Sequence, residues 1–128
     1  MYVDSSVVLA QLLVEDRRPD PSFWRQESII SSRLLEYETW TKINSHRLAH
    51  SHGGDVRRLF AGISMLELTP PILARALDPF PAPIRTLDAL HLATIEFLRG
   101  IGQRPTLATY DRRLSGAAAS LAIATVEP

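Results

Sequence analysis

The stretch that decides the fold is Met1-Tyr2-Val3-Asp4-Ser5-Ser6-Val7-Val8-Leu9-Ala10, at the start of the chain. Its first three residues predict a short buried strand, and a helix through Val14 follows, with Ser5 or Ser6 as its N-cap. The same order, a short apolar strand and then a helix, recurs along the chain. Short strands that alternate with helices indicate an α/β domain around a buried parallel sheet.

The rest of the sequence continues this alternation. The expected strands are residues 28–31, 66–69, 106–110 and 123–126, and the expected helices are residues 21–24, 34–48, 55–63, 70–77, 86–100 and an alanine-rich helix after residue 114. The segment His50-Ser51-His52-Gly53-Gly54 is expected to end the long helix, after which Asp55 caps the next one. Residues 78–83 contain three prolines and are expected to form a loop.

The composition excludes several classes of protein. The 128 residues are 45% hydrophobic, which is enough for one compact domain over residues 1–128. The absence of cysteine excludes thiolate zinc sites, disulfide frameworks and thiol nucleophiles. Fourteen basic residues balance fourteen acidic ones, so no global positive field indicates nucleic acid. The first apolar stretch is far shorter than the roughly 20 residues of a membrane span, and we expect a cytoplasmic protein without a signal peptide.

Four acidic residues stand where the expected elements would present them to one point: Asp4, Glu38, Asp88 and Asp111. Asp4 and Asp111 follow expected strands, while Glu38 and Asp88 lie near the starts of expected helices. In open parallel sheets, ligands bind beyond the carboxyl ends of the strands. Clustered carboxylates favour a hard cation, because Mg²⁺ and Mn²⁺ take oxygen ligands. This is the chemistry of phosphodiester cleavage.

Each acid also has a structural interpretation that the residues themselves leave open. Asp4 and Asp111 could cap the helices that follow them, and Asp88 could be a first-turn acid favoured by the helix dipole. Glu36 and Glu38 are two residues apart, so on one helix they point to nearly opposite sides. Only one of the two can enter a site, and the periodicity does not decide which.

The histidines give weaker signals. His91 shares a helical face with Asp88, and a structural role, orienting Asp88 or contacting another helix, is the favoured interpretation. His46 and His50 have the i, i+4 spacing of a zinc pair. No acid completes that pattern, so a solvated helix end is expected there.

Four segments together resemble the PIN-domain ribonucleases, and most of all the VapC toxins of VapBC toxin–antitoxin pairs. They are Tyr2-Val3-Asp4-Ser5-Ser6, Ser32-Arg33-Leu34-Leu35-Glu36-Tyr37-Glu38, Thr86-Leu87-Asp88-Ala89-Leu90-His91-Leu92-Ala93 and Thr109-Tyr110-Asp111-Arg112-Arg113-Leu114. The resemblance spans essentially the whole chain in the right order, and the third segment is the most specific. It implies a three-layer α/β/α PIN-like fold with a central parallel sheet.

The resemblance also implies an activity, that of a metal-dependent endoribonuclease acting as a toxin. The family's catalytic acids fall on Asp4, Glu38, Asp88 and Asp111, so the second motif selects Glu38 over Glu36. The implied cofactor is Mg²⁺, held chiefly by Asp4 and Asp88, with Mn²⁺ able to substitute. The implied partners are an RNA substrate, a small cognate antitoxin protein and a second copy in a homodimer.

Further residues take expected roles from their place beside these motifs. Ser6 and Thr109 match small hydroxyl residues near the first and last acids. The arginines at 85, 112 and 113 adjoin the acids in sequence and could bind RNA phosphates, or could be solvated. An aromatic set is the expected docking surface for the antitoxin, with the protein core as the alternative place for its tryptophans: Phe23, Trp24, Tyr37 and Trp40.

Two other phosphoryl-transfer folds are excluded by single residues. A phosphatase of the haloacid-dehalogenase kind needs a second aspartate two residues after Asp4, where this chain has Ser6. A response-regulator receiver needs an acidic pair and a late lysine, but the only lysine is Lys42. The remaining alternative is a non-catalytic PIN module that binds RNA or protein. Such modules usually lose one or more acids, and all four are present here.

Overall fold

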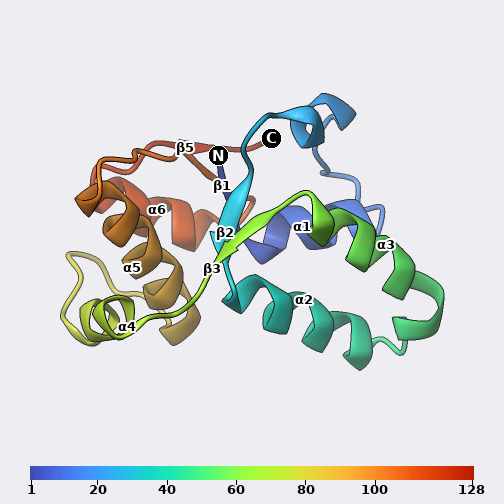
Figure 1. Cartoon of the computed structure of the whole chain (residues 1–128), viewed down its shortest axis with the longest axis horizontal. Helices are drawn as coiled ribbons and strands as arrows, with labels where there is room; N and C mark the ends of the chain where they lie inside the picture. The colour runs from blue at the N-terminus through green and yellow to red at the C-terminus, as the bar shows by residue number, and fades with distance from the viewer.

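Five short parallel strands form the centre of the molecule in the computed structural model, which describes residues 1–128 (Figure 1). The strands are β1 (Tyr2–Val3), β2 (Ile30–Ser32), β3 (Ser64–Leu66), β4 (Leu107–Ala108) and β5 (Thr125–Val126). They lie in the order β3-β2-β1-β4-β5, and every neighbouring pair is parallel. The strand that opens the chain therefore occupies the middle of the sheet.

Helices cover both faces of this sheet. They are α1 (Ser5–Leu12), a 3₁₀ helix η1 (Pro21–Arg25), α2 (Leu34–Ser45), α3 (Ala49–Ala61), α4 (Pro70–Leu77), α5 (Thr86–Gly100) and α6 (Arg112–Ser120). Figure 1 shows α1, α2 and α3 on one side of the sheet and α4, α5 and α6 on the other. The expected three-layer α/β/α arrangement is confirmed. No helix combines the length and apolarity that a membrane crossing requires.

The two helix layers bury separate cores because neighbouring residues of a strand face opposite sides. Val3 and Ala108 belong to the core beneath α1, α2 and α3, together with Leu35 and Val56. Their strand neighbours Tyr2 and Leu107 belong to the core beneath α5 and α6. A two-residue strand such as β1 thus anchors both layers at once.

The boundary between α2 and α3 differs from the prediction. The chain turns at residues 46–48, where Arg47 adopts a left-handed conformation with φ of 55°, and not at the expected segment 50–54. Gly53 and Gly54 lie inside α3, and Asp55 is an interior residue rather than its cap. The helix tolerates both glycines because burial of Val56 in the core outweighs their weak helix propensity.

The position of strand β3 also differs from the prediction. It consists of Ser64–Leu66 rather than residues 66–69, and it pairs with β2 through Ile30, Ser31 and Ser32. Ile63, just before it, packs into the core. Residues 64–66 form the strand, and Glu67, which follows it, is free to pair with Arg33 at the surface.

Candidate active site

A cavity of 530 Å³ opens beyond the carboxyl ends of β1 and β4, and it contains all four predicted acids. We call it the acidic cavity. Its lining residues are Asp4, Ser5, Ser6, Leu9, Glu38, Arg85, Thr86, Leu87, Asp88, His91 and Asp111. Elements far apart in the sequence supply them, since Asp4 follows β1, Glu38 lies on α2, Asp88 on α5, and Asp111 begins α6. The register of β1 against β4 sets the two strand ends side by side.

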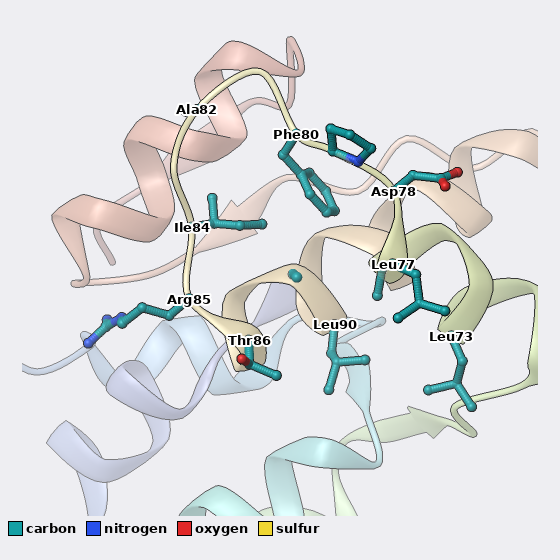
Figure 2. Close-up of a pocket in the computed structure, with 12 residues that line it drawn as sticks. Leu73, Leu77, Asp78, Phe80, Ala82, Ile84, Arg85, Thr86 and Leu90 are labelled. Atoms are coloured by element: carbon teal, nitrogen blue, oxygen red, sulfur yellow. The ribbon is translucent and has the colours of Figure 1, made fainter.

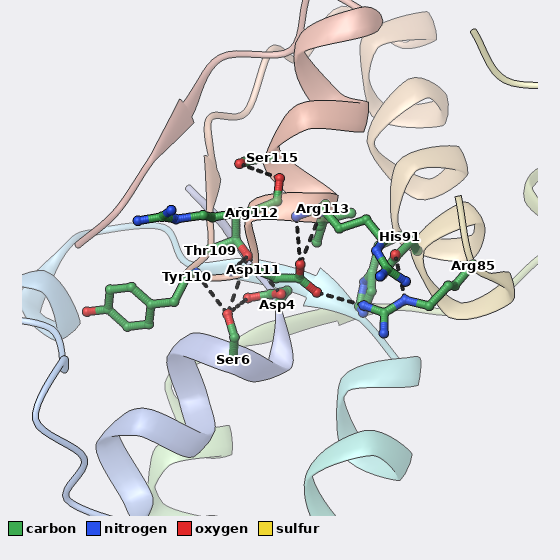
Figure 3. Close-up of polar contacts among 12 residues, drawn as sticks. Asp4, Ser6, Arg85, His91, Thr109, Tyr110, Asp111, Arg112, Arg113 and Ser115 are labelled. Atoms are coloured by element: carbon green, nitrogen blue, oxygen red, sulfur yellow. Dashed lines mark hydrogen bonds and ion pairs between the residues drawn. The ribbon is translucent and has the colours of Figure 1, made fainter. Parts of the chain in front are cut away.

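Asp4 is the most deeply buried of the four acids, with 4% of its surface exposed. It occupies the N-cap position of α1, where a serine was expected, but its side chain makes no capping hydrogen bond. Instead Ser6 Oγ donates to Asp4 Oδ1 at 2.7 Å and Thr109 Oγ1 donates to Oδ2 at 2.9 Å (Figure 3). Burial raises the pKa of Asp4 to about 6, although both hydrogen bonds act in the opposite direction.

The two hydroxyl groups also join the turn after β1 to the turn after β4. Ser6 Oγ accepts a hydrogen bond from the backbone N–H of Tyr110 at 2.9 Å. Thr109 Oγ1 accepts one from the backbone N–H of Asp111, also at 2.9 Å. The predicted hydroxyl positions are therefore structural supports of the acids beside them. They fix the orientation of Asp4 and the start of α6 together.

Arg85 bridges two of the acids at the mouth of the cavity. Its Nη2 lies 3.0 Å from Asp111 Oδ2 (Figure 3). Its Nε lies 3.5 Å from Asp88 Oδ2. The Asp88 side chain is 11% exposed, whereas that of Arg85 is 58% exposed. The guanidinium is therefore a solvent-facing partner of two carboxylates that are more buried than itself. The exposed Arg112 and Arg113 make no ion pair.

Asp111 combines the two roles that the sequence left open. Its Oδ1 accepts hydrogen bonds from the backbone N–H groups of Arg113, at 2.9 Å, and Leu114, at 3.3 Å, and so caps α6. Its Oδ2 faces Arg85 at the cavity. Asp88 likewise lies in the first turn of α5, as the dipole interpretation expected, and lines the cavity as well.

The geometry separates Glu38 from Glu36. Glu38 Oε1 lies 2.6 Å from His91 Nε2, and the side chain lines the cavity. Glu36 forms an ion pair with Arg33 at 2.6 Å and is absent from the cavity lining. His91 contacts the neighbouring helix α2, one of the two expected structural roles, and has no hydrogen bond with Asp88.

Tyr2 was not predicted from the sequence to contact any residue of the acidic cavity. Its hydroxyl lies 2.7 Å from His91 Nδ1 in the protein interior. The only signal was a tyrosine in a short buried strand, because a buried hydroxyl requires a partner. Burial lowers the pKa of His91, but its contacts with Tyr2 and Glu38 outweigh that effect and raise the pKa above the usual value.

The expected aromatic docking surface is mostly core. Phe23 is buried and stacks edge-to-face on Trp24, whose Nε1 donates to Gln11 Oε1 at 3.0 Å. Trp24 and Trp40 both pack against the core beneath α1 and α2. Only Tyr37 is open to solvent, with 68% of its surface exposed.

Comparisons with known proteins agree with this architecture. The family model of the PIN domain matches residues 1–119. Ribonuclease VapC46 of Mycobacterium tuberculosis is 31% identical, over the whole of this chain and 97% of the relative. Ribonuclease VapC47 of the same species is 26% identical, over the whole of this chain and 96% of the relative.

A solved structure has the same fold. The crystal structure of Mycobacterium tuberculosis VapC20, a sarcin–ricin loop cleaving toxin, matches with a TM-score of 0.73 and 20% identity. The match covers 99% of this chain and 98% of that one. This match shows the shared fold, while the family model and the VapC46 similarity establish that the chain belongs to the PIN-domain family and, within it, to the VapC ribonucleases.

Proposed function

We propose that this protein is a cytoplasmic, Mg²⁺-dependent endoribonuclease, the toxin of a toxin–antitoxin pair, acting as a single domain over residues 1–128. The observation that carries the proposal is the gathering of Asp4, Glu38, Asp88 and Asp111 around one cavity. Three similar proteins are named as ribonucleases, which supports RNA as the substrate class. A non-catalytic module would have no need to keep four acids in one solvent-accessible cavity, since burying carboxylates costs stability.

The donor set fits a magnesium ion. Every acidic group that lines the cavity offers hard oxygen ligands, and Asp4 and Asp88 are the two most buried. No three His, Asp or Glu side chains form a closed cluster around one point. Mg²⁺ does not require one, because it commonly uses one or two carboxylates together with water and substrate phosphate. We therefore assign Asp4 and Asp88 as its ligands, with Mn²⁺ able to replace it.

Each residue then has a defined task in hydrolysis. When bound, Mg²⁺ polarises the scissile phosphate and lowers the pKa of water. Glu38 orients the attacking water and accepts its proton. Asp111 stands at the cavity wall beside Arg85, whose exposed guanidinium can leave the carboxylates and bind an RNA phosphate. Ser6 and Thr109 keep the Asp4 oxygens in place throughout.

Two adjacent surfaces fit the partners of such a toxin. A groove of 440 Å³, lined by Leu9, Leu34, Tyr37 and Leu87 among others, adjoins the acidic cavity and shares Glu38 with it. An amphipathic antitoxin segment could occupy this groove and direct a basic side chain toward the acids. This assignment replaces the tryptophans with Tyr37 as the aromatic anchor of the docking surface.

We assign the homodimer contact to a different, apolar surface. A cavity of 660 Å³ lies between α4, the loop 78–85 and α5, and its lining includes Leu73, Leu77, Phe80, Ile84 and Leu90 (Figure 2). Leu77 is 88% exposed and Leu73 is 43% exposed. Large exposed apolar side chains around a hollow are typical of a protein–protein interface, and a second copy of the chain is the occupant we propose.

Cleavage of RNA by the purified chain tests the enzymatic proposal. We expect hydrolysis with Mg²⁺ or Mn²⁺ and none with EDTA, since an all-oxygen site cannot activate water without an ion. Glu38→Gln should lower the rate by at least about 100-fold, while Glu36→Gln, its matched control two residues away, should be mild. Cleavage that persists in EDTA would exclude the metal mechanism.

Metal binding has a readout that does not depend on activity. Mg²⁺ or Mn²⁺ should raise the thermal midpoint of the wild-type protein, because a ligand of the folded state stabilises it. Asp88→Asn should lose this response while it unfolds at nearly the same temperature in EDTA. A full metal response in Asp88→Asn would remove Asp88 from the ligand set.

A further inference from the structure

A hydrogen-bonded series leads from the protein interior to the acidic cavity and consists of Tyr2 on β1, His91 on α5 and Glu38 on α2. The Tyr2 hydroxyl is 2.7 Å from His91 Nδ1, and His91 Nε2 is 2.6 Å from Glu38 Oε1. Tyr2 and His91 are 0% and 1% exposed, and their rings meet edge-to-face at 5.7 Å. The series therefore links the central strand to helices from both layers.

The chemistry of the three groups fixes the direction of one of these hydrogen bonds. An ionised carboxylate only accepts hydrogen bonds, so His91 Nε2 must carry a proton and donate it to Glu38. The other ring nitrogen either accepts from the Tyr2 hydroxyl or, in an imidazolium, donates to it. In both states each ring nitrogen has a partner, and the imidazole cannot rotate without losing both.

Glu38 is held at one oxygen only. His91 is its single hydrogen-bonding partner, and its side chain is 16% exposed on the cavity side. No arginine or lysine pairs with Glu38, in contrast to Glu36 and its partner Arg33. The second oxygen of Glu38 therefore has no partner within the protein and is available to the cavity.

Resting on the proposed nuclease function, we infer that Tyr2 and His91 are positioning residues that anchor one oxygen of Glu38 and so aim the other at the attacking water. A free glutamate side chain populates many rotamers, and fixing one of them costs conformational entropy. The buried imidazole meets this cost during folding, before RNA arrives. Neither Tyr2 nor His91 needs to touch the substrate.

The competing explanation is that the series only stabilises the core. Paired substitutions separate the two. His91→Gln can place an amide N–H near the position of Nε2, whereas the shorter His91→Asn cannot reach Glu38. Tyr2→Phe removes one hydroxyl and keeps the ring packing. His46→Asn, at an exposed position outside the cavity, is the control for a histidine substitution.

If Tyr2 and His91 position Glu38, their variants should show the following rates of RNA cleavage. His91→Asn should lower kcat about 10- to 100-fold with little change in KM, as is typical when a supporting partner of an active-site group is lost. His91→Gln should recover most of that loss, and Tyr2→Phe should show a smaller decrease. His46→Asn should match the wild type. Thermal unfolding of each variant identifies any loss of rate that comes from unfolding.

Nitrogen-15 NMR of the His91 ring tests the geometry in the wild-type protein without any assay of activity. We expect a protonated Nε2 whose resonance shifts in Glu38→Gln. A ring protonated only at Nδ1 would overturn the inference. So would folded His91→Asn and Tyr2→Phe variants that cleave RNA at the wild-type rate while Glu38→Gln is inactive. A wild-type protein that cleaves no RNA would instead contradict the proposed function, and the NMR result would still report on the series.

Discussion

Asp4 is a buried carboxylate whose neighbours are hydroxyl donors rather than basic side chains. Ser6 and Thr109 orient both of its oxygens, yet burial raises its pKa to about 6. Orientation and burial therefore act against each other in the metal-free protein. A carboxylate that is well placed but poorly solvated is suited to a cation, because the ion compensates the charge that burial disfavours.

This conflict predicts a pH-dependent effect of Asp4→Asn on stability. The pKa of Asp4 in the folded state, about 6, exceeds its usual value of 3.8, so the charged form destabilises the folded state. The penalty is absent below about pH 4 and complete above about pH 6. Because one pKa unit corresponds to about 1.4 kcal/mol, Asp4→Asn should raise the free energy of unfolding in EDTA by up to roughly 3 kcal/mol at pH 7.

Urea denaturation at several pH values between 4 and 7 measures this effect. The gain in Asp4→Asn should shrink toward zero as the pH falls to 4. Asp16→Asn, at an exposed acid, should stay within about 0.5 kcal/mol of the wild type at every pH. A loss of stability in Asp4→Asn at pH 7 would show that the hydrogen bonds from Ser6 and Thr109 outweigh the burial of charge.

Helix α3 shows how tertiary packing decides the state of a segment that local preference would break. Its sequence carries Gly53 and Gly54, yet the helix is continuous from Ala49 to Ala61. Val56 is fully buried, and Leu59 and Phe60 pack against the same core. The apolar face of the helix thus compensates for glycines that each cost about 1 kcal/mol relative to alanine.

Alanine substitution at two glycines should therefore have opposite effects. Gly54→Ala should raise the free energy of unfolding by about 0.5–1 kcal/mol, because the new Cβ would meet only the Arg58 side chain, at 3.6 Å or more. Gly102→Ala should lower it by about 1 kcal/mol or more, because Gly102 has φ of +93° although the space around it is open. Chemical denaturation measures both. Destabilisation by Gly54→Ala would contradict the account of α3.

At the scale of the whole molecule, the acidic cavity lies where the two helix layers meet at one end of the sheet. Asp4 and Glu38 belong to the side of α1 and α2, while Asp88 and Asp111 belong to α5 and α6. The layers bury separate cores, and the His91–Glu38 contact joins them. A partner that binds across this end would contact both layers at once.

The apolar surface at α4 predicts an effect on assembly. Leu77→Lys should convert the proposed dimer to a monomer, because it places a charge at the most exposed leucine of that surface. Ile101→Lys, at another exposed apolar residue, should leave the mass in solution unchanged. Light scattering after gel filtration measures both. A wild-type chain that is monomeric at high concentration would contradict the dimer.

The proposed antitoxin groove predicts a second effect on assembly. Co-expression with the adjacent small open reading frame should relieve growth arrest and yield a complex without ribonuclease activity. Tyr37→Ala should weaken that complex, because Tyr37 is the large exposed aromatic residue of the groove and aromatic anchors dominate such interfaces. Harmless overexpression of an active wild-type chain would contradict the toxin assignment.

The sequence by itself predicted the fold class, because this depends on local patterns, and its resemblance to the PIN-domain ribonucleases pointed to the four acids. Short apolar segments such as residues 1–3 predict strands. The segment around Asp88 and His91 is the most specific indication of the family. The sequence also anticipated that hydroxyl groups at Ser6 and Thr109 accompany the acids, although not that both donate to Asp4. The local pattern indicates which residues lie near the end of each strand. The order of the motifs, which matches that of the PIN-domain family, indicates that these strand ends lie together in the fold.

Only the tertiary structure decided features that depend on contacts between distant segments. It extended α3 through Gly53 because of core packing, and it joined Glu38 to His91, a residue more than fifty positions away. It also paired Tyr2 with His91 and packed the tryptophans, which the sequence offered as a docking surface, against the core. These outcomes follow from burial and from the need of buried polar groups for partners, and neither is encoded in the spacing of residues along one helix or strand.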